Sequence, residues 1–321
     1  WRGIGYQAGV RYEHTWFVGE LTNTGETFNY IYPKSLKEID KVLFPAIYLS
    51  KKIKDKHEFQ MNYSRKIGRP GFMQLIPFIM YADRQSVQIG NPVLGPEFIN
   101  LGEVNYSFTG NKGSLLTSVY ARQTLFSITP VVFTSEIDPE ILISSYVNGR
   151  DKLDIGWETT IKRSITKWLD FTTNANVFYT KVSLEQGGKL VNNEGFSWNI
   201  KGMLSVKATK RLNFQWNGNY EAPRIIPQGK VNPIWFMDFS CSYIFNKKFS
   251  ASATLSDAFN TKQYGTIFLT DNFTQRSVRR WESRYFRVNL TWKFGEPDVS
   301  IFRRRSGGRR EPGSGGTEME M

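Results

Sequence analysis

Only three residues of this 321-residue chain are cysteine or histidine, the residue types typical of redox and zinc sites, and none has the neighbours that such chemistry requires. Cys241 is the single cysteine, so an intramolecular disulfide, a CxxC redox pair and a cysteine-rich zinc site are all excluded. His14 and His57 are the only histidines, they lie far apart in the sequence, and neither joins a Ser/His/Asp or Asp/His pattern. We therefore predict that the chain is not an enzyme and holds no metal and no cofactor.

Composition narrows the class of protein further. Apolar residues make up 40% and aromatic residues 15% of the chain, yet the mean hydropathy is -0.41 and no stretch approaches the roughly 20 apolar residues of a membrane helix. A helical membrane protein is thus excluded, which leaves a soluble β protein or a transmembrane barrel. The net charge of +13 is spread over strands and turns, so nucleic-acid binding is not predicted.

Alternation with a period of two dominates the chain. In residues 285–294, Phe286, Val288 and Leu290 lie on one face of a predicted strand, and Arg287 and Asn289 lie on the other. We predict twelve such strands, at about 4–18, 42–53, 56–66, 97–109, 112–127, 143–163, 167–183, 195–208, 210–221, 233–246, 247–258 and 283–294. Most are longer than the five or six residues usual in soluble sheets.

The predicted connections alternate between short and long. Tight turns are expected near Lys54-Asp55, Gly110-Asn111, Ser164-Thr166, Thr209 and Asn246, and long segments at 19–41, 67–96, 128–142, 184–194, 222–232 and 259–282. Outer-membrane barrels have short periplasmic turns and longer extracellular loops. The pattern therefore predicts an all-β, transmembrane antiparallel barrel in the outer membrane, with lipid as its surroundings.

The two faces of each predicted strand differ in the cost of exposing them to lipid. Moving the last strand by one residue would place Arg287 and Lys293 in hydrocarbon, at about 2–4 kcal/mol each near the midplane. The apolar face is therefore expected to face lipid and the polar face the lumen. Aromatic residues near strand ends are expected at the two membrane interfaces, for example Trp168, Phe171, Tyr179, Trp235 and Phe245.

Short motifs between Phe59 and Phe108 carry a resemblance to a known family. They are Tyr63-Ser64-Arg65, Arg69-Pro70, Leu75-Ile76-Pro77-Phe78, Gly90-Asn91-Pro92 and Leu94-Gly95-Pro96-Glu97, and a second set, Leu255-Ser256-Asp257-Ala258-Phe259-Asn260 and Trp292-Lys293-Phe294-Gly295, lies near the C-terminal end. In order and spacing the chain resembles the barrel domain of TonB-dependent outer-membrane receptors. We interpret Arg69, Pro70, Asn91, Pro92, Pro96 and Glu97 as structural motif residues, with Arg69 and Glu97 paired at the barrel rim.

The resemblance implies more than the chain contains. Receptors of that family have twenty-two strands around an N-terminal plug, with a segment that TonB pulls from the periplasm. Twelve strands would then be about half of the barrel, with the plug and the TonB-binding segment missing; a smaller barrel of twelve strands that closes on itself is the alternative. Because Trp1 is followed directly by strand-like sequence, we expect a mature or excised piece of a longer protein. A surface lipoprotein lid is a further partner that the family implies.

Two regions are expected in the chain. Residues 1–295 form the barrel domain, and residues 296–321 form a disordered periplasmic tail rich in Arg and Gly.

The favoured function is energy-coupled import of a scarce nutrient of the siderophore, cobalamin, glycan or peptide class. Loops would determine specificity, and the candidate ligand contacts are Tyr30, Tyr32, Tyr81, Arg84, Tyr264 and Arg276; a solvated loop residue is the alternative at each. A passive porin or an anchoring barrel is the main alternative function. An outer-membrane enzyme and a soluble carbohydrate-binding β protein are the others.

Overall fold

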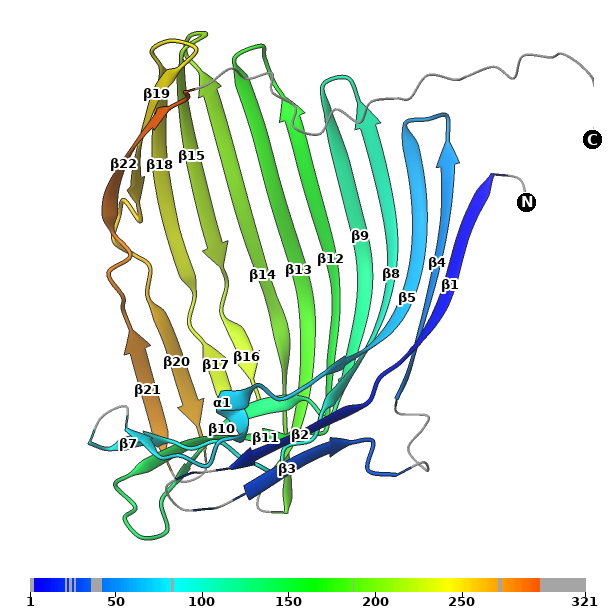
Figure 1. The fold of residues 1–321 in the computed structure, drawn as a ribbon, viewed down its shortest axis with the longest axis vertical. Coiled ribbons are helices and arrows are strands. Elements are labelled where there is room, and N and C mark those ends of the chain that lie inside the picture. The colour runs from blue at the N-terminus through cyan, green and yellow to red at the C-terminus, as the bar shows by residue number, and fades with distance from the viewer. Residues whose placement is uncertain are drawn as a thin grey trace, which may run out of the picture.

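Twelve strands form one antiparallel sheet in the computed structural model, which describes residues 3–294 apart from 21, 23–24, 26, 36–41, 82–83, 187 and 271–272. In spatial order they are β1 (Ile4–Tyr12), β4 (Leu43–Ile53), β5 (His57–Gly68), β8 (Glu97–Gly110), β9 (Gly113–Leu125), β12 (Asp151–Ser164), β13 (Leu169–Gln186), β14 (Lys189–Lys207), β15 (Leu212–Glu221), β18 (Ile234–Ile244), β19 (Phe249–Ser256) and β22 (Tyr285–Trp292). The sheet is open, with β1 and β22 at its two edges (Figure 1). The predicted all-β class and the count of twelve are confirmed; the predicted tail at 296–321 lies outside the described residues.

Five tight turns lie at one end of the sheet, and five longer connections lie at the other end together with the two-residue connection between β13 and β14 (Figure 1). The turns comprise residues 54–56, 111–112, 165–168, 208–211 and 245–248. The alternation predicted from the sequence is thus confirmed for five of the six long connections, and the exception is the segment expected at 184–194. By the convention of outer-membrane barrels, the end with the turns is periplasmic and the opposite end is extracellular.

Strand register sorts apolar and polar side chains onto opposite faces. Phe286 pairs with Leu255, and Leu255 pairs with Phe239, so one apolar face continues across three strands. On the other face, Ser252 pairs with both Asn289 and Ser242. Every second residue of a strand projects to the same side, so this register gives one lipid-compatible face and one polar face, as predicted.

The extracellular connections contain sheets of their own. These are a pair, β2 (Thr15–Glu20) and β3 (Thr27–Tyr32), and two four-stranded sheets: β10 (Ile128–Thr134), β11 (Leu142–Asn148), β7 (Ser86–Gln88) and β6 (Met80–Tyr81), and β16 (Arg224–Ile226), β17 (Gly229–Val231), β20 (Tyr264–Leu269) and β21 (Thr274–Arg279). The short helix α1 spans Phe72–Leu75. Within the described ranges, no helix is long and apolar enough to cross a membrane.

Three of the predicted boundaries are wrong. The strand expected at 4–18 breaks at Glu13-His14, and the strand expected at 143–163 divides at Gly149-Arg150, where the chain leaves β10 and joins β9. The loop expected at 184–194 is instead the end of the β13–β14 hairpin, in which Leu184 pairs with Val191. Backbone hydrogen bonds extend this hairpin beyond the part of the sheet that faces lipid. Its outer residues therefore need no apolar face, and the alternation of side chains did not predict that the strands continue there.

Candidate functional site

A cavity of about 1230 Å³ lies at the extracellular end, on the polar side of the main sheet. Its walls are the ends of β8, β9 and β12 together with both four-stranded loop sheets. Segments distant in the sequence therefore meet around one space, which is the size expected of a site for a sizeable small molecule.

Cationic side chains outnumber carboxylates in the lining. The charged lining residues are Arg122, Lys152, Arg224, Arg276 and Arg279, against Glu97 and Asp154. The Lys152 ammonium lies 2.9 Å from the Asp154 carboxylate, which also accepts a 2.6 Å hydrogen bond from Thr180. The four guanidinium groups make no ion pair with any described residue, so their hydrogen-bond donors are available to a ligand.

Three of the six ligand contacts predicted from the sequence line this cavity: Tyr81, Tyr264 and Arg276. Tyr32 instead packs in a small core with Val42, Phe44 and Phe98 and is only 7% exposed. Arg84 is exposed but is not part of the lining. Tyr30 lies on β3, and its side chain falls outside the described part of the structure.

Sequence reasoning missed most of the cavity's cations. Arg122 and Lys152 could have been found, because both lie on the polar face of long strands near their extracellular ends. Arg224 and Arg279 could not have been found from the sequence. They lie on β16 and β21, which belong to one sheet although they come from two separate connections, and the sequence does not show which connections pair.

Side-chain hydrogen bonds join the walls of the cavity, among them those of Gln228 and Glu97. The buried Gln228 amide, at the turn between β16 and β17, accepts a 2.8 Å hydrogen bond from the Val132 N–H and donates a 3.1 Å bond to the Val132 carbonyl. Glu97, at the start of β8, accepts a 2.9 Å bond from the Ile128 N–H on β10. The first contact connects the two loop sheets, and the second ties one of them to the main sheet.

The family-motif residues make contacts within the scaffold. Asn91 donates to the Tyr146 carbonyl at 2.8 Å, which joins the loop after β5 to β11. Among the motif prolines of this loop, Pro70 and Pro96 are buried and Pro92 is half-buried. The predicted pair between Arg69 and Glu97 is wrong, because Arg69 pairs with Glu13. Strand β1 ends at Tyr12, and the residue that follows it places its carboxylate at the loop end of β5.

Neither histidine joins a reactive cluster among the residues that the structure describes. His57 forms a 2.8 Å hydrogen bond with the Tyr106 hydroxyl and packs against Phe108 on the neighbouring strand. Groups of three or more His, Cys, Asp or Glu residues that could hold a metal ion are absent from this part of the chain. The cavity lining presents guanidinium groups, tyrosine hydroxyls and side-chain amides, which are hydrogen-bonding groups suited to non-covalent binding.

Comparison with known proteins places the chain in context. The sequence profile described as the outer membrane protein beta-barrel family matches residues 1–292. No curated protein matches the chain.

Several solved structures share the fold at low sequence identity. The siderophore receptor PiuA from Acinetobacter baumannii aligns with a TM-score of 0.57 and 12% identity, over 91% of this chain and 41% of that one. The siderophore receptor PirA from Pseudomonas aeruginosa aligns with a TM-score of 0.54 and 14% identity, over 78% and 42%. The ferric enterobactin receptor PfeA from Pseudomonas aeruginosa aligns with a TM-score of 0.53 and 13% identity, over 92% of this chain and 44% of that one. The chain therefore spans less than half the length of each of these receptors.

Proposed function

The chain belongs to the outer membrane protein beta-barrel family and lies in the outer membrane, and from this premise we propose that it is part of a TonB-dependent receptor that imports a scarce nutrient. In this proposal the twelve strands are the C-terminal portion of a larger barrel. The plug and the TonB-binding segment belong to other parts of the same protein. The proposal assigns no catalytic step to the chain.

The cavity at the extracellular end is the observation that carries the proposal. A passive pore needs only a polar lumen, whereas here two loop sheets line one cavity with the main sheet and are joined to each other by Gln228. A space of this kind is suited to capturing a ligand before passage. The fold shared with siderophore receptors supports the same class of function, but the ligand remains of the siderophore, cobalamin, glycan or peptide class.

The unpaired guanidinium groups favour a ligand with anionic or strongly accepting oxygen atoms. Arg224 and Arg276 come from different strands of one loop sheet, and Arg122 comes from the main sheet, so the three reach the cavity from two walls. Hydrogen bonds from guanidinium to anionic oxygen are roughly twice as strong as neutral ones. Replacing such a residue should weaken capture without affecting assembly of the barrel.

Uptake by cells tests the proposal. The complete protein is expressed in a strain that lacks its own receptors, with and without functional TonB, and uptake of radiolabelled ferric enterobactin, cobalamin, a mixed glycan pool and a peptide pool is measured. We expect that one of the probes is taken up and that its uptake requires TonB. The rate of this uptake should fall at least tenfold in the Arg276→Gln variant. Lys230→Gln is the matched control, because Lys230 lies on β17 of the same sheet but does not line the cavity.

Conductance measured in planar bilayers distinguishes a passive porin, the main alternative, from a TonB-dependent receptor. A large, steady conductance that does not depend on displacing a plug, together with probe uptake that is independent of TonB, would replace the proposal with a passive porin. An anchoring role would be indicated if no probe enters and no conductance appears.

A further inference from the structure

Lysine and arginine side chains are concentrated in the five tight turns. The turns carry eight cations, Lys54, Lys56, Lys112, Lys167, Lys210, Arg211, Lys247 and Lys248, and a single carboxylate, Asp55. All eight cations are exposed, and none forms an ion pair with a described residue. The barrel architecture does not require this charge, because a tight turn needs only suitable backbone conformations.

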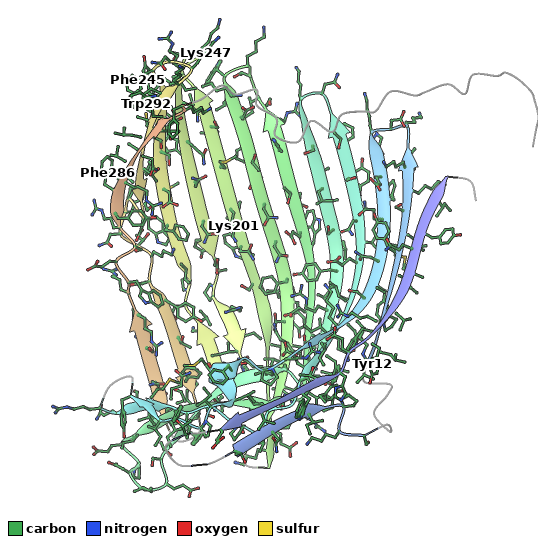
Figure 2. The ribbon with its side chains drawn as sticks, in the orientation of Figure 1. Tyr12, Lys201, Phe245, Lys247, Phe286 and Trp292 are labelled. Carbon is green, nitrogen blue, oxygen red and sulfur yellow. The ribbon has the colours of Figure 1, made fainter. Side chains whose placement is uncertain are left out.

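Exposed aromatic and aliphatic side chains lie next to these cations. Ile165 and Trp168 belong to the turn that carries Lys167, and both are more than half exposed. Phe245 and Trp292 lie close to Lys247 at the same end of the sheet (Figure 2). Cations at the outer end of a sheet, next to a band of aromatic side chains, are complementary to a lipid surface. The lipid phosphates would lie at the level of the cations, and the acyl chains would begin at the level of the aromatic rings.

One turn combines both features in a single recess. A cavity of about 680 Å³ is lined by Asn246, Lys247, Lys248, Phe249 and Trp292. Phe249 and Trp292 are directly paired across β19 and β22, so their side chains lie on the same apolar face. Lys247 stands at the turn end of this face, where a headgroup would lie (Figure 2), and Lys248 is the next residue of the same turn.

We propose that the turn at 245–248 is a binding site for an anionic glycerophospholipid of the periplasmic leaflet, and that the other cationic turns make weaker contacts with the same headgroups. Lys247 and Lys248 hold the phosphate, and Phe249 and Trp292 contact the first part of an acyl chain. The site is independent of nutrient import, because it lies at the end of the sheet opposite to the large cavity.

Lipid titration followed by native mass spectrometry tests this site on the complete protein in detergent. Phosphatidylglycerol and phosphatidylcholine with identical acyl chains are compared. A basic side chain near an anionic surface contributes about a fivefold gain in binding, so the K247Q/K248Q variant should bind phosphatidylglycerol about 25-fold more weakly. Its binding of phosphatidylcholine should not change, whereas Trp292→Ala should weaken the binding of both lipids.

Matched controls and salt complete the test. Lys230→Gln with Lys262→Gln removes two exposed lysines from the extracellular segments and should leave phosphatidylglycerol binding unchanged. Raising the salt concentration to 0.5 M should weaken the binding of phosphatidylglycerol only, because it screens exposed charges. Equal affinity for the two lipids in the unaltered protein would overturn the proposal. Peptidoglycan fragments are titrated in the same way. If the K247Q/K248Q variant lost affinity for these fragments but kept its affinity for phosphatidylglycerol, the proposal would also be overturned, and the turn would be assigned to binding of the cell wall.

Discussion

At the scale of single residues, Asp257 shows how a family motif acts through hydrogen bonds. It follows β19, is 1% exposed, and has a left-handed backbone with φ of 43°. Its carboxylate accepts hydrogen bonds from the Ser283 hydroxyl at 2.6 Å and from the Thr261 and Lys262 N–H groups at 2.9 and 3.2 Å. One side chain therefore joins the end of β19 to the segment that leads into β22.

Replacement of Asp257 should destabilise this junction in a graded way. Asp257→Asn keeps a residue type that tolerates positive φ but loses one acceptor oxygen, whereas Asp257→Ala loses both and strains the backbone. We expect Asp257→Ala to lower the free energy of unfolding by about 1–3 kcal/mol, since buried donors are left unsatisfied, and Asp257→Asn by less. Unfolding in urea from lipid vesicles measures both changes. Equal stability of Asp257→Ala and the unaltered protein would show that the carboxylate contributes nothing.

Residue identity alone predicted only part of the candidate site. Tyr81, Tyr264 and Arg276 were selected because they lie in long connections, and all three line the cavity. Tyr32 met the same criterion, yet it is buried against Phe98. Membership of a connection does not determine whether a side chain points into a shared space or into a local core, because that depends on how the connections pair with one another.

At the scale of elements, the main sheet was predictable and the loop sheets were not. Strands such as β22 alternate over their full length, and lipid makes a shift in register costly. By contrast β6, β7, β16 and β17 are two or three residues long, too short for a periodic signal. Their pairing joins distant segments, as when Ser86 of β7 pairs with Leu142 of β11.

Gln228 is expected to make the two loop sheets behave as one unit. Gln228→Ala removes both hydrogen bonds to Val132 in a buried place, which costs about 1–3 kcal/mol locally. We expect hydrogen exchange to become faster in β10 and in the β16–β17 hairpin, with no change in β12 or β13. Gln263→Ala is the control, because Gln263 is exposed and, among the described residues, its side chain bonds to Arg280 alone. If the exchange rates of β10 and β16 did not change together, the loop sheets would be independent.

At the scale of the whole molecule, the orientation in the membrane links the two proposed sites. The large cavity lies at the loop end of the sheet, and the cationic turns lie at the other end (Figure 1). Each proposal therefore depends on which end faces the cell exterior. The sequence already indicated this orientation through the alternation of short and long connections, since turn length reflects topology without any tertiary contact.

Cysteine labelling in intact cells tests the orientation directly. In a Cys241→Ala background, Ile137→Cys places a thiol at a 97% exposed position between β10 and β11, and Asn111→Cys places one in the exposed turn between β8 and β9. A membrane-impermeant maleimide should label Ile137→Cys in intact cells and Asn111→Cys only after the outer membrane is permeabilised. The opposite result would place the cavity in the periplasm and the cationic turns at the cell surface. Nutrient capture and phospholipid binding would then both fail, because each requires its site to face the compartment or leaflet that holds the ligand.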